Sequence, residues 1–231
     1  MPDAPSTIIE GIEVCLFDAY GTLFDVAAAA EHCRDDLGDA TGPLAELWRT
    51  KQIDYTRLLT LMDRYEDFWQ VTGHSLDYAM ESLGLTSSAL RARLMELYLN
   101  LDAYPEVAGL LETLRKRDFK TAILSNGSPS MLISAVKNSG IEDLLDAVIS
   151  VDSLKTYKPH PSVYQHGCDH WNTEPSAVCF MSSNAWDVAG AASFGLRVVW
   201  VNRTGALQEH IPGDPECTIT DLSELAGIIQ T

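Results

Sequence analysis

The stretch LFDAYGTLFDV, residues 16–26, follows a run of strand-forming residues and places an aspartate where that strand ends. Gly21 permits a tight turn there and brings backbone N–H groups towards whatever the Asp18 carboxylate faces. An aspartate that caps a turn is a common structural role, so on this stretch alone capping and catalysis both fit. Position 20 holds Tyr20 rather than a second acid, which indicates that Asp18 acts without an acidic neighbour.

Apolar runs rich in β-branched residues recur along the chain and are bounded by turn residues. They cover residues 12–17, 120–125, 147–151, 177–182 and 197–201, with 217–220 as a weaker sixth run. Runs of this kind indicate strands that are buried on both faces. Helical patterns start between them, near Pro105, Ser128, Pro161 and Asp187. The alternation predicts an α/β fold with a mostly parallel sheet and helices on both faces.

The interval 26–104 breaks this alternation, because it contains helical patterns and no convincing strand. One helical stripe comprises Leu44, Leu47, Trp48, Tyr55, Leu58, Leu59 and Met62. We therefore predict a Rossmann-like core domain formed by residues 1–25 and 105–231, with a helical cap subdomain of residues 26–104 inserted after the first strand. Ligands of open α/β sheets bind outside the carboxyl ends of the strands, and the insert leaves from that edge.

Composition and charge narrow the class of protein. The 231 residues are 46% hydrophobic, and 16 Lys and Arg face 33 Asp and Glu, for a formal charge of −17. This charge repels nucleic acid and anionic membrane surfaces, so neither is expected as a partner, and an anionic substrate would need a local cationic site.

Cysteine usage and the hydropathy pattern bear on the location of the protein. The five cysteines are scattered and form no CxxC pair, which is typical of free thiols in a reducing compartment. No apolar run approaches the about 18 residues of a membrane span, and the acidic N-terminus lacks the basic start of a secretory signal. A soluble cytoplasmic protein is expected.

Polar residues follow three further predicted strands. Ser125 and Asn126 precede a helix and could seat an anion, although a simple turn capped by Ser128 explains part of this pattern. Lys158 precedes Pro159 and is thereby kept out of helical geometry, as many solvated loop lysines are. The last group comprises Ser182, Ser183, Asn184 and Asp187, which is more polar residues than a turn needs.

Other candidate sites have structural explanations. Arg49 flanks an apolar helix stripe, where an arginine is most often a snorkelling surface residue. His166, Cys168 and His170 have the spacing of a transition-metal site, but no carboxylate or distant partner accompanies them, so surface and core roles are favoured. The chain has no GxSxG, GxGxxG or GxxxxGK(S/T) sequence, which removes the usual signs of serine hydrolase, dinucleotide and P-loop chemistry.

Four ordered motifs, DAYGT, SNG, YKPHPSVY and SSNAWD, together resemble the L-2-haloacid dehalogenases of the haloacid dehalogenase superfamily. The resemblance covers nearly the whole chain, including WRTKQIDYT in the helical insert. Superfamily phosphatases carry a second Asp two residues after the nucleophile and further acids in the last motif to hold magnesium. Here those places hold Tyr20 and the Ser-Ser-Asn run, and Asp187 alone makes a weak magnesium site. A halide leaves as a stable anion and needs neither acid nor metal.

The resemblance implies covalent catalysis, in which Asp18 attacks C2 of a 2-haloalkanoate and water then hydrolyses the resulting ester. The catalytic group implied in this way is Asp18, Thr22, Lys158, Tyr164, Ser182, Asn184 and Asp187. Lys158 would keep Asp18 ionised, with Thr22 and Tyr164 fixing the network. The residues of the SSNAWD motif would orient Lys158 and the hydrolytic water, with Asp187 as the favoured base.

The resemblance also implies a substrate and halide site made of Tyr20, Arg49, Phe68, Ser125, Asn126 and Trp186. Ser125 and backbone N–H groups near Tyr20 and Asn126 would receive the substrate carboxylate. Arg49 would meet the leaving halide together with Asn126. Phe68 and Trp186 would form apolar walls.

The sequence therefore predicts a hydrolase without metal or other cofactor that converts short L-2-haloalkanoic acids into D-2-hydroxyalkanoic acids with inversion. A homodimer is expected from the resemblance. Two alternatives stay open at this point: a phosphatase of the same superfamily with an altered metal site, and a catalytically silent binding protein on the same fold. The preferred halogen, the chain length and the dimer surface are open as well.

Overall fold

The computed structural model describes residues 7–231, in which six parallel strands form one sheet in the order β3-β2-β1-β4-β5-β6. The strands are β1 (Val14–Phe17), β2 (Lys120–Ser125), β3 (Ala147–Ser150), β4 (Val178–Ser182), β5 (Arg197–Val201) and β6 (Cys217–Ile219). All six predicted runs are thus confirmed as strands, including the weaker sixth. The order reverses between β1 and β4, which is the switch point where doubly wound sheets bind ligands.

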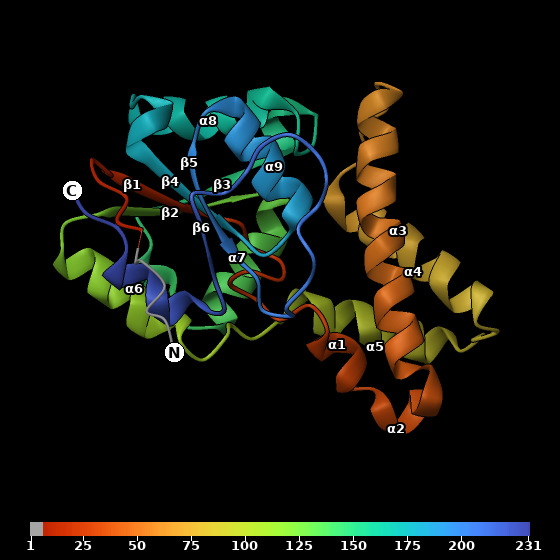
Figure 1. Cartoon of the computed structure of the whole chain (residues 1–231). Coiled ribbons are helices and arrows are strands. Elements are labelled where there is room, and N and C mark those ends of the chain that lie inside the picture. The colour runs from red at the N-terminus through yellow and green to blue at the C-terminus, as the bar shows by residue number, and fades with distance from the viewer. Residues whose placement is uncertain (1–6) are drawn as a thin grey trace.

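Helices cover both faces of the sheet (Figure 1). The helices α6 (Val107–Lys116) and α7 (Pro129–Asn138) lie on one face, and α8 (Pro161–Trp171) and α9 (Ala185–Phe194) lie on the other. Proline begins α7 and α8, where its missing N–H costs nothing. Short 3₁₀ helices complete the connections: η1 (Gly38–Ala40), η2 (Glu142–Leu144), η3 (Val151–Leu154), η4 (Pro175–Ala177) and η5 (Leu222–Gly227).

Five α-helices occupy the predicted insert and lie beside the sheet, off one end of its strands (Figure 1). They are α1 (Ala28–Glu31), α2 (Arg34–Leu37), α3 (Thr41–Leu61), α4 (Phe68–Ser82) and α5 (Ser88–Leu99). Asp67 and Ser87 accept hydrogen bonds from the first backbone N–H groups of α4 and α5 and so fix where these helices begin. The division into core and cap domains stays a prediction, and residues 1–6 of its first segment lie outside the described residues.

The apolar stripe of α3 is buried only along part of the helix. Leu44 and Trp48 are almost fully buried, whereas Leu58 is 50% exposed and Met62, just beyond the helix, is 57% exposed. Figure 1 shows why, because the C-terminal end of α3 extends past the other helices of the insert. The helix is therefore confirmed. Its apolar stripe is packed near the N-terminal end and exposed near the C-terminal end.

Close packing brings the helices onto the sheet near the switch point. A Cβ atom on Gly167 of α8 would lie 2.8 Å from Leu16 Cδ1 of β1 and 3.2 Å from Leu124 Cδ2 of β2. A larger residue at position 167 would displace these leucine side chains, so glycine favours the close approach of α8 to the strands. No helix within residues 7–231 combines the length and the apolar character that crossing a membrane requires.

Candidate active site

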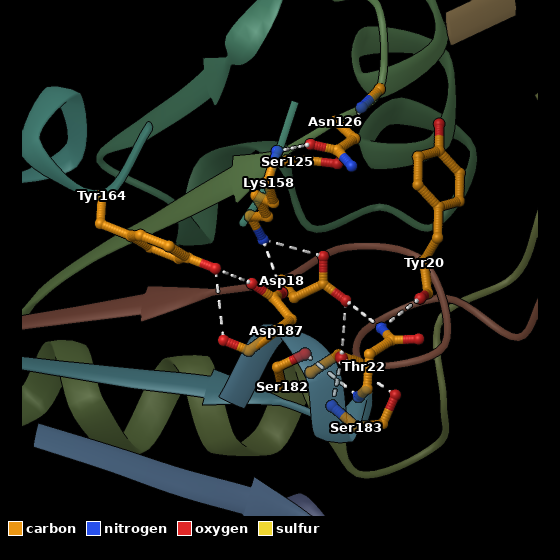
Figure 2. Close-up of polar contacts among 12 residues, drawn as sticks. Asp18, Tyr20, Thr22, Ser125, Asn126, Lys158, Tyr164, Ser182, Ser183 and Asp187 are labelled. Atoms are coloured by element: carbon orange, nitrogen blue, oxygen red, sulfur yellow. Dashed lines mark hydrogen bonds and ion pairs between the residues drawn. The ribbon is translucent and has the colours of Figure 1, made fainter. Parts of the chain in front are cut away.

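Asp18 follows β1 and lies at the carboxyl end of the sheet, next to the end of β4 (Figure 2). Its backbone N–H donates to the Met181 carbonyl at 2.9 Å, which continues the pairing with β4. Asp18 as a whole residue is 6% exposed. Its Oδ1 accepts from Lys158 Nζ at 3.1 Å, and its Oδ2 accepts from Thr22 Oγ1 at 3.1 Å and Asn184 Nδ2 at 2.8 Å. Both oxygens are thus held by donors from separate parts of the chain.

Lys158 is the cation of the site and is 1% exposed. Its Nζ lies between two carboxylates, 3.1 Å from Asp18 Oδ1 and 2.9 Å from Asp187 Oδ2 (Figure 2). Its backbone N–H donates to Asn126 Oδ1 at 3.0 Å. Burial by itself lowers the pKa of Lys158, but the Asp18 and Asp187 carboxylates outweigh it and raise the pKa above its ordinary value. The ammonium therefore stays charged.

Asp187 is fully buried in the first turn of α9. Besides the ion pair with Lys158, its Oδ1 accepts a hydrogen bond from the Tyr164 hydroxyl of α8 at 2.8 Å. Burial raises the pKa of Asp187 above its ordinary value, although the Lys158 ammonium opposes this shift. A buried carboxylate with a raised pKa is a stronger base than an ordinary aspartate.

The two serine residues at the end of β4, Ser182 and Ser183, hold the neighbours of Asp18. The backbone N–H of Ser183 donates to Thr22 Oγ1 at 2.8 Å, and this bond orients the Thr22 hydroxyl towards Asp18. Ser182 Oγ accepts from the backbone N–H of Asn184 at 3.1 Å. The structure thus connects Ser182 to Asn184, whereas the resemblance implied that it orients Lys158.

Ser125 and Asn126 lie at the end of β2, on the other side of Asp18 from the residues of β4 (Figure 2). Ser125 Oγ accepts from the Gly127 N–H at 3.1 Å, and Ser150 Oγ donates to the Gly127 carbonyl at 2.6 Å. A Cβ atom on Gly127 would lie 2.8 Å from the Tyr20 ring. The turn that was predicted to seat an anion is therefore tightly built and faces the site.

Arg49 of helix α3 reaches the residues around Asp18. Its Nη2 donates to the Tyr20 carbonyl at 3.2 Å and to Asn184 Oδ1 at 3.1 Å, and its Nη1 donates to Gln52 Oε1 at 2.7 Å. Asn184 in turn binds Asp18, so a single side chain separates the Arg49 guanidinium from the carboxylate. Arg49 thus lies one side chain away from Asp18, and its assignment to the leaving halide together with Asn126 stays a prediction.

Two of the predicted apolar residues, Tyr20 and Phe68, pack against each other, whereas the contact found for the third, Trp186, is with Arg57 of α3. The Tyr20 ring is directed away from the Asp18 carboxylate (Figure 2) and lies 5.6 Å from the Phe68 ring of α4, between centroids, with the two rings tilted by 30°. Its hydroxyl is buried and has no hydrogen-bond partner within the described chain, and burial raises its pKa. The Trp186 ring, on α9, lies 5.1 Å from the Arg57 guanidinium of α3.

Two residues at the site were not predicted. Gln52 binds Arg49, as described above, and Arg203 donates from Nη2 to the Thr22 carbonyl at 2.9 Å and to Glu106 Oε1 at 2.6 Å. Gln52 lies within WRTKQIDYT, but nothing in that stretch distinguishes it. Arg203 follows β5, so the rule that polar residues at strand ends form the site could have found it.

The residues around Asp18 do not fit a magnesium ion. The position between Asp18 and Asp187 is taken by the Lys158 ammonium, and both Asp187 oxygens already accept hydrogen bonds. The Tyr20 carbonyl accepts from Arg49 and, at 3.4 Å, from Asn184. Magnesium requires free oxygen ligands in octahedral geometry, which this arrangement does not offer. Across residues 7–231, no group of three or more His, Cys, Asp or Glu is placed to hold a metal.

Comparison with known proteins identifies the family. The family model described as haloacid dehalogenase-like hydrolase matches residues 12–195. The chain is 45% identical to (S)-2-haloacid dehalogenase 1 of Pseudomonas sp. (strain CBS-3), with 96% of this chain and 98% of that protein covered.

Two solved structures resemble the fold closely. The crystal structure of a dehalogenase with an intermediate complex superposes with a TM-score of 0.94 at 41% identity, covering 96% of this chain and 99% of the other. The L-2-haloacid dehalogenase from Xanthobacter autotrophicus with chloropropionic acid covalently bound superposes with a TM-score of 0.85 at 35% identity, covering 94% of this chain and 97% of the other. By its motifs, its fold and these relatives, the chain belongs to the haloacid dehalogenase-like hydrolases.

Proposed function

We propose that the protein is an (S)-2-haloacid dehalogenase, which hydrolyses short-chain L-2-haloalkanoic acids to D-2-hydroxyalkanoic acids with inversion. The observation that carries the proposal is the buried Asp18 carboxylate, which Lys158, Thr22 and Asn184 hold on both oxygens. The similarity to dehalogenases, including one with chloropropionic acid covalently bound, supports it. Tyr20, which stands two residues after Asp18, cannot supply the carboxylic acid that would protonate an alkoxide leaving group.

In the first step, an Asp18 oxygen attacks C2 of the substrate from the face opposite the halogen. A new C–O bond forms, the C–halogen bond breaks, and the halide leaves with the bonding electron pair. The product of this step is an ester between Asp18 and the substrate, with C2 inverted. Lys158 keeps Asp18 ionised for the attack, which agrees with its raised pKa.

In the second step, water attacks the carbonyl carbon of the Asp18 ester, and a proton passes from the water to a base. Asp187 is the proposed base, because burial raises its pKa and because Lys158 and Tyr164 fix its position. The oxyanion that forms on Asp18 is met by the donors that hold its carboxylate in the free enzyme. When the intermediate collapses, the bond between the acyl carbon and the C2 oxygen breaks, and the departing oxygen takes up the remaining proton of the attacking water. Asp18 is regenerated as a carboxylate, Asp187 releases its proton to solvent, and the 2-hydroxy acid leaves with C2 in its inverted configuration.

The substrate is held by groups on both sides of Asp18. We assign the Ser125 hydroxyl and the backbone N–H groups near Tyr20 and Asn126 to the substrate carboxylate. Arg49, with Asn126, is assigned to the departing halide, while Phe68 and Trp186 bound the alkyl group. Since α3 and α4 of the insert supply Arg49 and Phe68, residues 26–104 act as the cap over a core of residues 1–25 and 105–231.

Location and assembly complete the proposal. A reducing cytoplasm suits the five free cysteines, four of which are buried. A homodimer is expected from the family resemblance. Light scattering of the purified chain in solution measures its mass directly, and a mass of one chain would contradict the dimer.

The deciding experiment measures halide release from L- and D-2-chloropropionate separately, with EDTA present and the product resolved by chiral chromatography. We expect release from the L form alone, with D-lactate as product. Asp18→Asn is expected to reduce the rate by at least about 10³-fold, because the nucleophile is lost. Retention of full activity in this variant would refute the assignment of Asp18.

The two alternatives give different results in the same assay. A phosphatase would release no halide and would hydrolyse phosphate esters once magnesium replaced EDTA. A silent binding protein would do neither while still binding 2-chloropropionate.

A further inference from the structure

Gln52 is a polar side chain in the interior of the helical insert. It lies on α3 and is 1% exposed. A buried amide is costly unless its oxygen and its nitrogen are both hydrogen-bonded. Here both are, because Oε1 accepts from Arg49 Nη1 at 2.7 Å and from the Tyr98 hydroxyl at 3.2 Å, while Nε2 donates to Thr72 Oγ1 at 2.8 Å.

The direction of this hydrogen-bond chain is determined. The single Thr72 hydroxyl proton goes to the Phe68 carbonyl at 2.6 Å, so Thr72 Oγ1 can only accept from Gln52. The amide nitrogen must therefore face Thr72, and the amide oxygen must face Arg49. A Gln52 amide turned the other way would set its N–H groups against the guanidinium N–H groups.

The contacts of Gln52 connect three helices to one guanidinium. Gln52 and Arg49 lie on α3, Thr72 lies on α4 and Tyr98 lies on α5. The Tyr98 ring also stacks 5.5 Å from the Tyr20 ring, between centroids. On its opposite side the guanidinium reaches Tyr20 and Asn184 at the active site. The position of the Arg49 guanidinium therefore depends on how the three helices hold the Gln52 amide, whose oxygen binds Arg49.

We infer that Gln52 is the positioning residue of Arg49 and that it sets how strongly the enzyme stabilises the departing halide. The inference rests on the proposed function, in which Arg49 meets the halide. Gln52 touches neither substrate nor halide and acts through Arg49. A neutral amide oxygen fixes the guanidinium in one orientation and leaves its positive charge for the halide, whereas a carboxylate at the same place would neutralise that charge.

The test compares Gln52→Leu and Gln52→Glu with the wild type, using Ser75→Ala as the matched control. Ser75 is also fully buried in the insert, but its hydroxyl bonds only to the Val71 and Thr72 carbonyls of its own helix. The rates are measured with L-2-chloropropionate and L-2-bromopropionate, and chloride binding is measured by the broadening of the chloride NMR line. Thermal unfolding shows whether each variant is folded.

We expect Gln52→Leu to lower kcat for the chloro substrate by about tenfold and to lower it less for the bromo substrate, because bromide is the better leaving group. KM should change little. Gln52→Glu, which keeps the shape, should lose the chloride line broadening. Ser75→Ala should keep the wild-type ratio of the two rates.

Other results would overturn the inference. One is an equal loss of kcat with the chloro and bromo substrates in a folded Gln52→Leu variant. The other is chloride binding by Gln52→Glu that equals that of the wild type. If Gln52→Leu does not fold, the Gln52→Glu comparison decides alone. If the wild-type protein releases no halide, the proposed function is contradicted instead. Wild-type activity is measured first, so this failure is distinguished from a failure of the inference about Gln52.

Discussion

The ammonium group of Lys158 stays protonated to a higher pH than that of a lysine on the surface. Asp18 and Asp187 raise its pKa above the ordinary value of 10.5, despite its burial. The stability contributed by its charge is therefore fully present below pH 10.5 and is lost as the pH rises through the higher value in the folded protein. We predict that kcat and the melting temperature hold up to pH 10.5 and decline together above it.

Asp187 determines how kcat depends on pH in the acid range, because the proposed base must be ionised to accept a proton. Its pKa is raised above 3.8, so kcat should fall on acidification at a pH higher than an ordinary aspartate would give. Profiles of kcat and of thermal unfolding between pH 4 and 12 check both limbs. A decline in kcat near pH 8 with the fold intact would contradict the assignment of the alkaline limb to Lys158.

The sequence alone predicts those site residues that follow strands. Asp18, Ser125 and Asn184 could be placed together because carboxyl ends of parallel strands meet at one edge. Which side chains contact each other could not be read from the sequence, even where a residue such as Arg203 follows a strand. Gln52 meets Tyr98 across 46 positions, and Arg203 meets Thr22 across 181, so neither contact leaves a local pattern.

Between α9 and the loop that carries Lys158, the packing depends on one glycine. A Cβ atom on Gly190 would lie 2.5 Å from Pro159 Cβ and 2.6 Å from the Tyr164 hydroxyl. We predict that Gly190→Ala displaces Tyr164 from Asp187, destabilises the fold by about 1–3 kcal/mol and lowers kcat about tenfold or more.

Gly109→Ala is the matched control, since Gly109 is exposed on α6 and nothing lies within 4 Å of an added Cβ. It should be neutral or stabilising by up to about 1 kcal/mol. Chemical denaturation and kcat of both variants are the measurements. Equal behaviour of the two alanine variants would show that the contact with Tyr164 has no effect.

Sheet and helical insert differ in how well the sequence predicts them. Parallel strands are buried on both faces, so each gives a continuous apolar run with polar ends. The insert gives a weaker signal, because its stripe on α3 includes Leu58 and Met62, which are exposed. The four-residue helices α1 and α2 leave no periodic pattern at all, since they are shorter than two turns.

Taken as a whole, the molecule repels its proposed substrate. The net charge is −17 and a 2-haloalkanoate is an anion. Raising the ionic strength from about 0.01 M to about 0.15 M shortens the screening length from about 30 Å to about 8 Å. We predict that kcat/KM for L-2-chloropropionate rises about twofold over this range, while kcat stays constant.

Sodium sulfate is the suitable salt, because chloride is a product of the reaction. Initial rates at low substrate concentration give kcat/KM, and rates at saturation give kcat. A fall of kcat/KM with added salt would mean that the local field of Arg49 governs the encounter, and that the distant acids do not.

The Lys158 ammonium, placed between Asp18 and Asp187, also has a consequence for the living cell. A counter-charge carried on a side chain is made with the polypeptide and cannot dissociate from it. Every folded copy therefore carries the positive charge between Asp18 and Asp187, whatever the concentration of dissolved divalent ions. Starvation for magnesium and competition from calcium or manganese, which change the occupancy of a metal site, leave this charge in place.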